Sequence, residues 1–253
     1  MKDRIYVATF AEDAEETIKE WGVNIEFNHI CISECLDSEN IEKTIDEMKK
    51  YWKDCEAQSA VIHGPFTEII PAGIDHRMVE AGFERLEEAY EVCSKLGIKR
   101  MIVHTGFVPL MYHKEWHIEK SRDFWKSFLK DKPADFKILI ENVFEDEPYM
   151  MKDLIDAIDD SRAAVCLDVG HANAMTKKDI PVEAWVEVLG ERIEHIHIHN
   201  NDGSGDTHCD IDQGTMEWKK ILNMLDIYAK DGYTVTVESR QAMNSVKLLL
   251  DDI

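Results

Sequence analysis

The chain has 253 residues, 44% of them hydrophobic and 32% charged, with a formal net charge of −22 at pH 7. This acidic balance argues against a broad nucleic-acid-binding surface, because duplex binding depends on lysine and arginine side chains that neutralise phosphates. The first residues contain only a short apolar run and no later run reaches spanning length, so we predict neither a secretory leader nor a membrane helix. A cytoplasmic protein is expected, with its six cysteines as free thiols.

Short apolar runs typical of β-strands recur along the whole chain. Many are continuous rather than alternating, for example MIVH at 101–104 and AVCLD at 164–168. Parallel strands that are covered on both faces have this pattern. The expected strands are Ile5–Phe10, Val23–Phe27, Ala60–His63, Met101–His104, Ile138–Glu141, Ala164–Asp168, Ile193–His199 and Thr234–Glu238.

Helical periodicity and capping residues mark the segments between these strands. Apolar positions from Ile41 to Trp52 keep helical spacing behind Asn40, and Gly97 stands where a helix from Asp75 would end. Further helices are expected at Trp116–Leu129, Met150–Ile158, Pro181–Leu189, Glu217–Lys230 and Ser245–Asp252.

Eight strands that alternate with helices in a chain of this length predict an α/β fold, a single-domain (β/α)8 TIM barrel spanning residues 1–253. Active sites of such barrels lie at the carboxyl ends of the strands. Six consecutive predicted strands carry a histidine, aspartate or glutamate at or near that end. Solvent-facing strand termini would explain any single one, but six in succession indicate a common site. The six residues are His63, His104, Glu141, Asp168, His197 and Glu238.

Three loop residues, His171, Asp206 and His208, join these six as candidate ligands. All of the candidates offer nitrogen or oxygen donors, which suit zinc or manganese. The whole set exceeds the roughly four ligands that one tetrahedral zinc needs, so we expect about two or three divalent ions. The strand at 193–199 supports this prediction, because alternation places His195, His197 and His199 on one face. Three imidazoles make a poor apolar core but are common metal ligands.

Several segments from the third strand to the eighth resemble the xylose isomerase-like TIM-barrel superfamily. This superfamily contains sugar phosphate isomerases and epimerases, and also the endonuclease IV type of hydrolase (AP endonuclease family 2). The segment GVNIEF in the second strand is similar to one in the isomerase branch. The other matching segments are VIHGPF, VHTGF, IENV, LDVGHAN, HIHNNDG, DTHCDIDQG and VES.

In the hydrolase branch, the resemblance implies three zinc ions. The first would be held by His63, His104 and Glu141, the second by Glu141, Asp168, His197 and Glu238, and the third by His171, Asp206 and His208.

In the isomerase branch, the resemblance implies a single divalent ion held by Glu141, Asp168, His197 and Glu238. Glu141 and Glu238 would exchange protons with the substrate, and His171 would contact it. The family pattern favours His197 as the ligand on its strand. His199 is then expected one layer further out, toward substrate, and His195 deeper, as a hydrogen-bonded structural residue.

All of the ligand positions that the hydrolase branch implies carry the matching residue type. This favours hydrolysis of a phosphoric ester of a small molecule, because a multinuclear zinc-type centre can polarise phosphoryl oxygens and generate hydroxide. The alternative is a metal-dependent (Mn, Mg, Co or Zn) sugar or sugar-phosphate isomerase or epimerase that uses Glu141 and Glu238 as its acid/base pair. A barrel that binds metal or ligand without catalysis is a third hypothesis.

The substrate is expected to be a small molecule, either phosphorylated or a sugar. Abasic DNA is disfavoured, because the loops after His63 and His104 contain no stripe of basic residues. His113 is a predicted substrate contact. Arg240 is another, for an anionic substrate, although a surface ion pair explains it equally well. The sequence leaves the substrate and the oligomeric state open.

Overall fold

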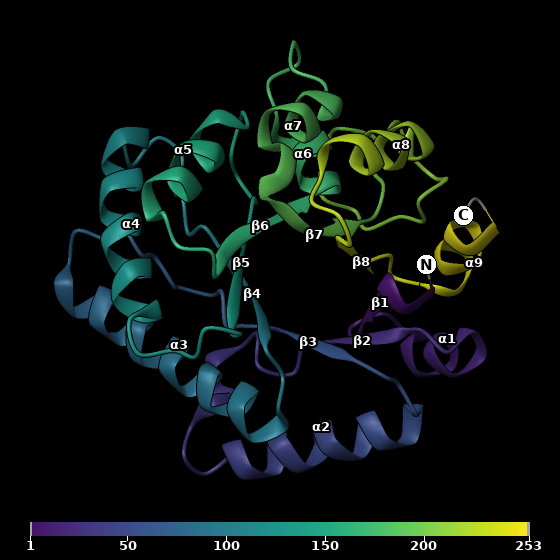
Figure 1. The fold of residues 1–253 in the computed structure, drawn as a ribbon, viewed down its shortest axis with the longest axis horizontal. Coiled ribbons are helices and arrows are strands. Elements are labelled where there is room, and N and C mark those ends of the chain that lie inside the picture. The colour runs from purple at the N-terminus through teal and green to yellow at the C-terminus, as the bar shows by residue number, and fades with distance from the viewer. Residues whose placement is uncertain (1, 252–253) are drawn as a thin grey trace.

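Eight parallel strands close into a barrel in the computed structural model, which describes residues 2–251 (Figure 1). Each strand pairs with its successor along the chain, and β8 pairs with β1 to complete the closure. The predicted TIM barrel is therefore confirmed. The strands are β1 (Ile5–Ala8), β2 (Asn24–Phe27), β3 (Ala60–His63), β4 (Arg100–His104), β5 (Lys137–Glu141), β6 (Ala163–Asp168), β7 (Ile193–Ile198) and β8 (Thr234–Val237).

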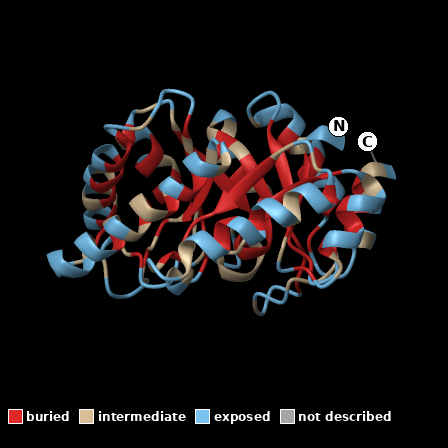
Figure 2. Ribbon diagram, turned by 90° about the horizontal axis from the view of Figure 1, so that it is seen from below, coloured by how far each residue is buried: buried red, intermediate tan, exposed pale blue. Residues whose placement is uncertain are grey.

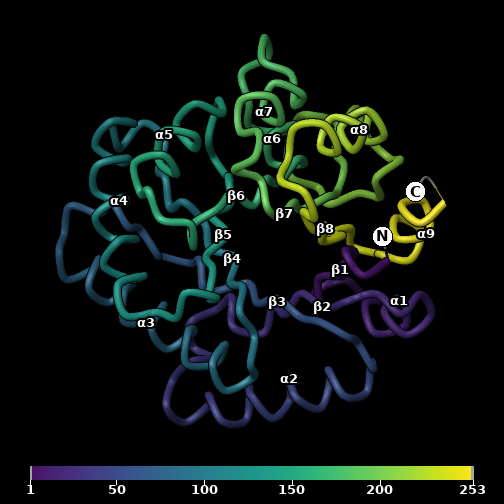
Figure 3. Tube along the Cα trace, in the orientation of Figure 1, coloured from purple at the N-terminus to yellow at the C-terminus, as the bar shows by residue number. Residues whose placement is uncertain are grey.

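Helices surround the barrel and connect its strands (Figure 3). Two short helices, α1 and α6, were not predicted, and the predicted end of the last helix at Asp252 lies outside the described residues. The helices are α1 (Ala14–Trp21), α2 (Ile41–Cys55), α3 (His76–Leu96), α4 (Lys114–Leu129), α5 (Tyr149–Ile158), α6 (Val169–Met175), α7 (Val182–Leu189), α8 (Trp218–Tyr228) and α9 (Met243–Asp251), with short 3-10 helices at Lys2–Arg4, Ser33–Leu36 and Gly190–Arg192.

The first and last helices fasten the two ends of the chain to each other. Asp13, just before α1, accepts hydrogen bonds from the backbone N–H groups of Ala242 and Met243 at 2.6 and 3.0 Å. Trp21 Nε1 donates to Met243 Sδ at 3.0 Å. These contacts hold β8 beside β1, where the barrel closes.

The strands at the centre of the fold are mostly buried, whereas the helices around them carry many exposed residues (Figure 2). The buried hydrophobic residues form a large core between the barrel and its helices, and a smaller one inside the barrel. The inner cluster fills the barrel interior on the side toward the amino ends of the strands. Two residues after its members on β3, β4 and β5 come His63, His104 and Glu141, which point inward as well because side chains alternate. The barrel interior thus changes from apolar to polar toward the carboxyl ends of the strands. The inner cluster consists of Tyr6, Val61, Ile102, Leu139, Ala164 and Cys166.

Among residues 2–251, no helix combines the length and apolar character that crossing a membrane requires. The cysteines in this part of the chain are all free thiols, as expected.

Candidate metal centre

Strand register brings the predicted ligands to one level of the barrel. His104 is paired directly with Glu141, and Asp168 is paired directly with His197. Asn142 holds two of these strand ends together, because its side chain exchanges two 2.9 Å hydrogen bonds with the backbone of Asp168. We call the residues at this level the polar ring: His63, His104, Glu141, Asp168, His197 and Glu238.

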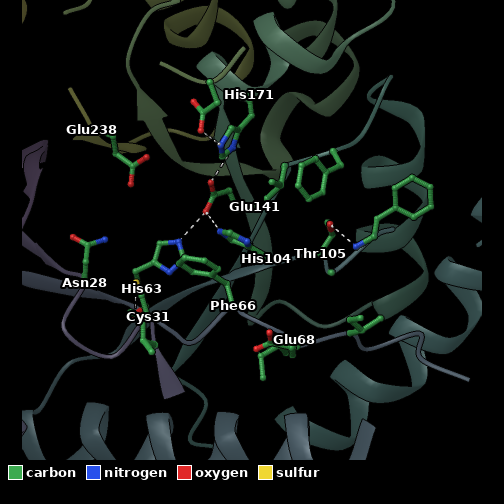
Figure 4. Close-up of a pocket in the computed structure, with 18 of the residues that line it drawn as sticks. Asn28, Cys31, His63, Phe66, Glu68, His104, Thr105, Glu141, His171 and Glu238 are labelled. Atoms are coloured by element: carbon green, nitrogen blue, oxygen red, sulfur yellow. Dashed lines mark hydrogen bonds and ion pairs between the residues drawn. The ribbon is translucent and has the colours of Figure 1, made fainter. Parts of the chain in front are cut away.

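Glu141 lies at the centre of the polar ring and is almost fully buried. Its Oε2 atom is 3.1 Å from His63 Nε2 and 3.5 Å from His104 Nε2 (Figure 4). Its Oε1 atom is 3.3 Å from His171 Nδ1 and 3.4 Å from His197 Nδ1. One carboxylate thus faces four imidazoles, which is the position that a ligand bridging two ions requires.

A second group of side chains, which we call the loop cluster, lies beside the polar ring around Asp206. Asp206 Oδ2 is 3.2 Å from His171 Nε2 and 3.1 Å from His208 Nε2. His199 Nε2 is 3.3 Å from Asp168 Oδ1 and 3.5 Å from Asp206 Oδ1. The loop cluster therefore consists of His171, His199, Asp206 and His208, whose ligand atoms all lie within 4.8 Å of one another.

Three of these histidines are fixed in the orientation that metal ligands adopt. Each places Nδ1 against a backbone carbonyl, which can only accept a hydrogen bond, so Nδ1 carries the proton. Nε2 of each ring then points to a carboxylate, where its lone pair would be available to a metal ion lying between the two, as in metal-bound histidines whose other nitrogen is held by a protein group. The contacts join His63 to Gly64 (2.9 Å), His171 to Asn142 (3.0 Å) and His208 to Glu238 (2.7 Å).

Several buried polar atoms in both groups lack hydrogen-bond partners among the described residues. They include His197 Nδ1, Asp168 Oδ2 and both ring nitrogens of His199. Buried polar atoms left unpaired are costly, and divalent cations in these groups would pair with His197 Nδ1, Asp168 Oδ2 and one of the two His199 nitrogens. The mixture of imidazole nitrogens and carboxylate oxygens fits zinc or manganese. The residues present therefore suit the metal that the sequence predicts.

Glu26 on β2 is a buried member of the site that sequence reasoning missed. Its Oε2 atom accepts a hydrogen bond from Thr236 Oγ1 at 2.6 Å and lies 3.2 Å from His197 Nε2. The same oxygen is 3.4 Å from His195 Nε2. Glu26 thus holds the far side of the His197 ring, so that Nδ1 faces Glu141. The available signal was a charged residue between Ile25 and Phe27, in a strand whose residues are all buried.

His195 and His199 occupy the layers below and above His197. His195 is buried and bonded to Thr234 Oγ1 at 2.5 Å and Thr236 Oγ1 at 2.9 Å, as expected of a structural histidine. His199 was expected to contact substrate. It is instead fully buried, does not line the cavity described below, and stacks on His208 with ring centroids 3.9 Å apart.

Close packing around the loop cluster depends on a glycine. A Cβ atom added at Gly170 would lie 2.1 Å from His199 Cε1 and 2.4 Å from His199 Nε2. Glycine lets the first turn of α6 lie against this imidazole, and Asp168 caps the same helix by accepting from the His171 N–H at 2.6 Å. His208 itself has a positive φ of 50°, an uncommon conformation for a residue other than glycine.

Glu141 and Glu238, the two carboxylates nearest to His197 Nδ1, differ in proton affinity. Burial raises the pKa of Glu238 to about 6, against the opposing charge of His197. Burial also favours the neutral form of Glu141, but the His197 and His104 imidazoles outweigh it and hold the Glu141 pKa well below its ordinary value. Both carboxylates approach the same nitrogen, His197 Nδ1, at 3.4 Å. Acid/base pairs in active sites are commonly built from carboxylates that differ in this way.

A cavity of about 720 Å³ opens above these groups (Figure 4). Asp168 and His197 lie beneath its floor, because both are fully buried and neither lines it. The ligand candidates that do line it are His63, His104, Glu141, His171, Asp206, His208 and Glu238.

The two other predicted substrate contacts lie away from this cavity. His113 is exposed just before α4, and Arg240 is exposed beyond β8; neither lines the cavity. Only the backbone of Arg240 serves the site, where its N–H donates to the His208 carbonyl at 3.0 Å. Trp116, in the first turn of α4, also does not line the cavity and donates its indole N–H to the Ala72 carbonyl at 3.0 Å.

Comparison with known proteins gives the same fold. The model of the xylose isomerase-like TIM barrel family matches residues 21–251. The uncharacterized protein MJ1311 of Methanocaldococcus jannaschii is 24% identical over 245 residues, covering 92% of this chain and 79% of its own. A solved D-tagatose 3-epimerase-like protein superposes with a TM-score of 0.77 at 23% identity, covering 98% of this chain and 96% of that one. The IolI protein, solved with a zinc atom, gives 0.74 at 13% identity and the same coverage.

Proposed function

Because the chain belongs to the xylose isomerase-like TIM barrel family, we propose that it is a metal-dependent epimerase or isomerase acting on a ketose-type sugar. The observation that carries this proposal is the pair Glu141 and Glu238. Both carboxylates approach His197 Nδ1 at 3.4 Å, and both line the same cavity. Two carboxylates beside one Lewis acid are what proton transfer on a hydroxy ketone needs.

In this proposal, Glu141 takes the proton from the carbon next to the substrate carbonyl, and the C–H electron pair moves to form an enediolate. Glu238, protonated beforehand, returns a proton to the opposite face of the same carbon, which gives an epimer. Return of the proton to the former carbonyl carbon, with transfer of the hydroxyl proton between the two oxygens, gives an isomer. After release of the product, proton exchange with water restores both carboxyl groups. Glu141, Asp168, His197 and Glu238 would hold the divalent ion. When bound, that ion polarises the substrate oxygens and lowers the cost of the developing negative charge.

The structural neighbours support this choice over hydrolysis, which was the leading sequence-based hypothesis. One is D-tagatose 3-epimerase-like. Further neighbours, at 14–16% identity, are 3-epimerases of D-allulose, D-psicose and L-ribulose. The zinc atom in the solved IolI protein supports zinc as the ion, with manganese as the alternative.

Phosphoric-ester hydrolysis remains a second candidate because of one feature, the loop cluster. Its four side chains form a group that could hold a metal ion, and so do Glu141, Asp168 and His197, which share no residue with the loop cluster. His63, His104 and Glu141 form another such group. A site with about two or three ions favours phosphoryl chemistry, since separate ions can activate water and stabilise the leaving oxygen.

The test is the metal content of protein purified without chelator, combined with exchange of sugar protons. We expect one exchangeable divalent ion per chain, and transfer of deuterium from D2O to a carbon of D-tagatose, D-fructose or D-allulose, followed by NMR. Glu238→Gln should abolish this transfer, while Asp212→Asn, in an exposed part of the loop after β7, should retain it. About two or three tightly held zinc ions, with turnover of bis(p-nitrophenyl) phosphate and no deuterium transfer, would replace the proposal by hydrolysis.

A further inference from the structure

The cavity above the polar ring has two unlike halves. The ligand candidates form one half. The other half consists of apolar side chains from the loops that follow β2, β3, β4 and β5, and one of them, Phe66, stacks on His104 with ring centroids 4.5 Å apart. We call six of these side chains the apolar wall: Ile32, Phe66, Ile69, Ile70, Val108 and Phe144.

No lysine or arginine of the described chain lines the cavity. The basic residue at the start of α4, Lys114, is held away by Asp146 at 2.5 Å and Glu147 at 2.6 Å. Glu68 adds a further negative charge to the lining. Binding sites for phosphate groups usually supply arginine or lysine donors, so the side chains here disfavour a phosphorylated substrate.

At α6, which follows Asp168 of the polar ring, backbone N–H groups do not take the place of lysine or arginine side chains as donors to a phosphate. Helix N-termini bind phosphates through their free N–H groups. At α6, however, the Asp168 carboxylate accepts from the His171 N–H and occupies this position. A phosphate brought there would meet an acidic side chain rather than a free donor.

The apolar wall is also incompletely covered within the described chain. Ile32, Phe66 and Phe144 are 62%, 38% and 51% exposed. Removing such surfaces from water is favourable, and an apolar group of the substrate could do so. The cavity volume of about 720 Å³ also lies in the upper part of the roughly 300–1,000 Å³ range of sites that enclose drug-sized ligands.

We propose that the substrate is an uncharged sugar bearing an apolar substituent, such as an alkyl or aryl ether, and that sugar phosphates are poor ligands. The hydroxyl-bearing carbons face the polar ring, and the substituent contacts the apolar wall. This inference rests on the proposed function, because it takes the reacting end to be a sugar.

Equilibrium binding to the manganese-loaded protein tests the inference without requiring turnover. The probes are D-fructose, its 1-O-benzyl and 6-O-benzyl ethers, and D-fructose 6-phosphate, measured by isothermal titration calorimetry. We expect one of the benzyl ethers to bind at least tenfold more tightly than D-fructose, and the phosphate to bind more weakly than both ethers. Tighter binding of the phosphate, equal binding of all four, or no binding of any would overturn the inference.

A charge introduced on the apolar wall gives a second, independent measurement. Phe144→Lys places a cation at an exposed wall position, and Tyr149→Lys is the matched control on the same loop-to-helix region, exposed but outside the lining. We expect Phe144→Lys to weaken binding of the benzyl ether at least fivefold and to strengthen binding of the phosphate. The control should change neither. Equal effects of both variants would show that the wall does not contact the ligand.

These outcomes stand apart from those of the proposed function. The deuterium-transfer experiment reports proton chemistry, whereas calorimetry reports which molecules the cavity accepts. Binding in the expected order without deuterium transfer would reject the epimerase or isomerase and keep the substrate class. Deuterium transfer with tight binding of the phosphate would do the reverse.

Discussion

The polar ring and the apolar wall line the same cavity but are built differently. Ring residues such as Glu141 and Asp168 lie at the ends of paired strands, are nearly fully buried, and have positions fixed by register. Wall residues such as Ile32 and Phe144 lie on loops and are more than half exposed. In TIM barrels the strand ends supply the reacting groups, and loops vary the substrate. Changes to the ring should therefore affect metal binding and chemistry, and changes to the wall should affect affinity.

The largest expected difference is between Glu141→Gln and a wall variant, Ile70→Ala. Loss of the Glu141 carboxylate removes a proton acceptor and a metal ligand, so we expect kcat to fall about 10²–10⁴-fold and metal content to drop. Ile70→Ala should raise KM by less than about 30-fold and leave kcat within about twofold, because it removes only apolar contact. Steady-state kinetics with elemental analysis measure both. A wall variant that loses kcat as strongly as the ring variant would contradict the division.

A smaller effect is expected from Glu26, which lies behind the polar ring and holds His197. Glu26→Gln keeps the shape but weakens the acceptor for His197 Nε2. We expect zinc affinity, measured by competition with a chelator, to fall about 10–100-fold, as for other residues that orient metal-bound histidines. Glu68→Gln is the matched control, a carboxylate that lines the cavity away from the ring. Unchanged affinity in a folded Glu26→Gln protein would show that Glu26 only packs.

The polar ring was predictable because it follows from two regularities of the sequence. Parallel strands are visible as apolar runs, and the residues at their carboxyl ends must converge in a closed barrel. His63, His104, Glu141 and Asp168 each end a strand, and the structure places them together. Strand register alone sets how these residues lie relative to one another, so their positions do not depend on the loops.

The remaining parts of the site depend on contacts that no local pattern reveals. Glu26 on β2 acquires its role only from its contacts with Thr236 on β8 and His197 on β7. These strands are far from β2 in the sequence and come near it only because the barrel closes. His199 falls just beyond the end of β7, where alternation no longer dictates which neighbours it meets. An apolar loop residue such as Ile32 could equally belong to a core, and only the fold places it on the apolar wall.

The fit between α6 and His199 provides a prediction about stability. Gly170→Ala adds a methyl group where His199 leaves no space, so we expect the metal-free protein to lose about 1–3 kcal/mol in urea unfolding, as for other overpacked positions. Gly205→Ala is the matched control in the loop after β7, because a Cβ there meets no atom within 4 Å. Equal stability of the two variants would mean that His199 moves aside at no cost.

The smallest expected effect is on how the free energy of unfolding changes with pH, and it comes from the buried His117. His117 is buried against Phe107, with ring centroids 5.2 Å apart, and burial lowers its pKa to about 4. The unfolded chain, with an ordinary histidine pKa of about 6.5, therefore binds a proton that the folded chain rejects between these values. Stability from this residue is complete above about pH 6.5 and is lost as the pH falls toward 4, by about 1 kcal/mol at pH 5.5. His117→Gln should remove this part of the pH dependence in urea unfolding. The exposed His76→Gln should leave the slope unchanged, and an unchanged slope in His117→Gln as well would refute the assignment.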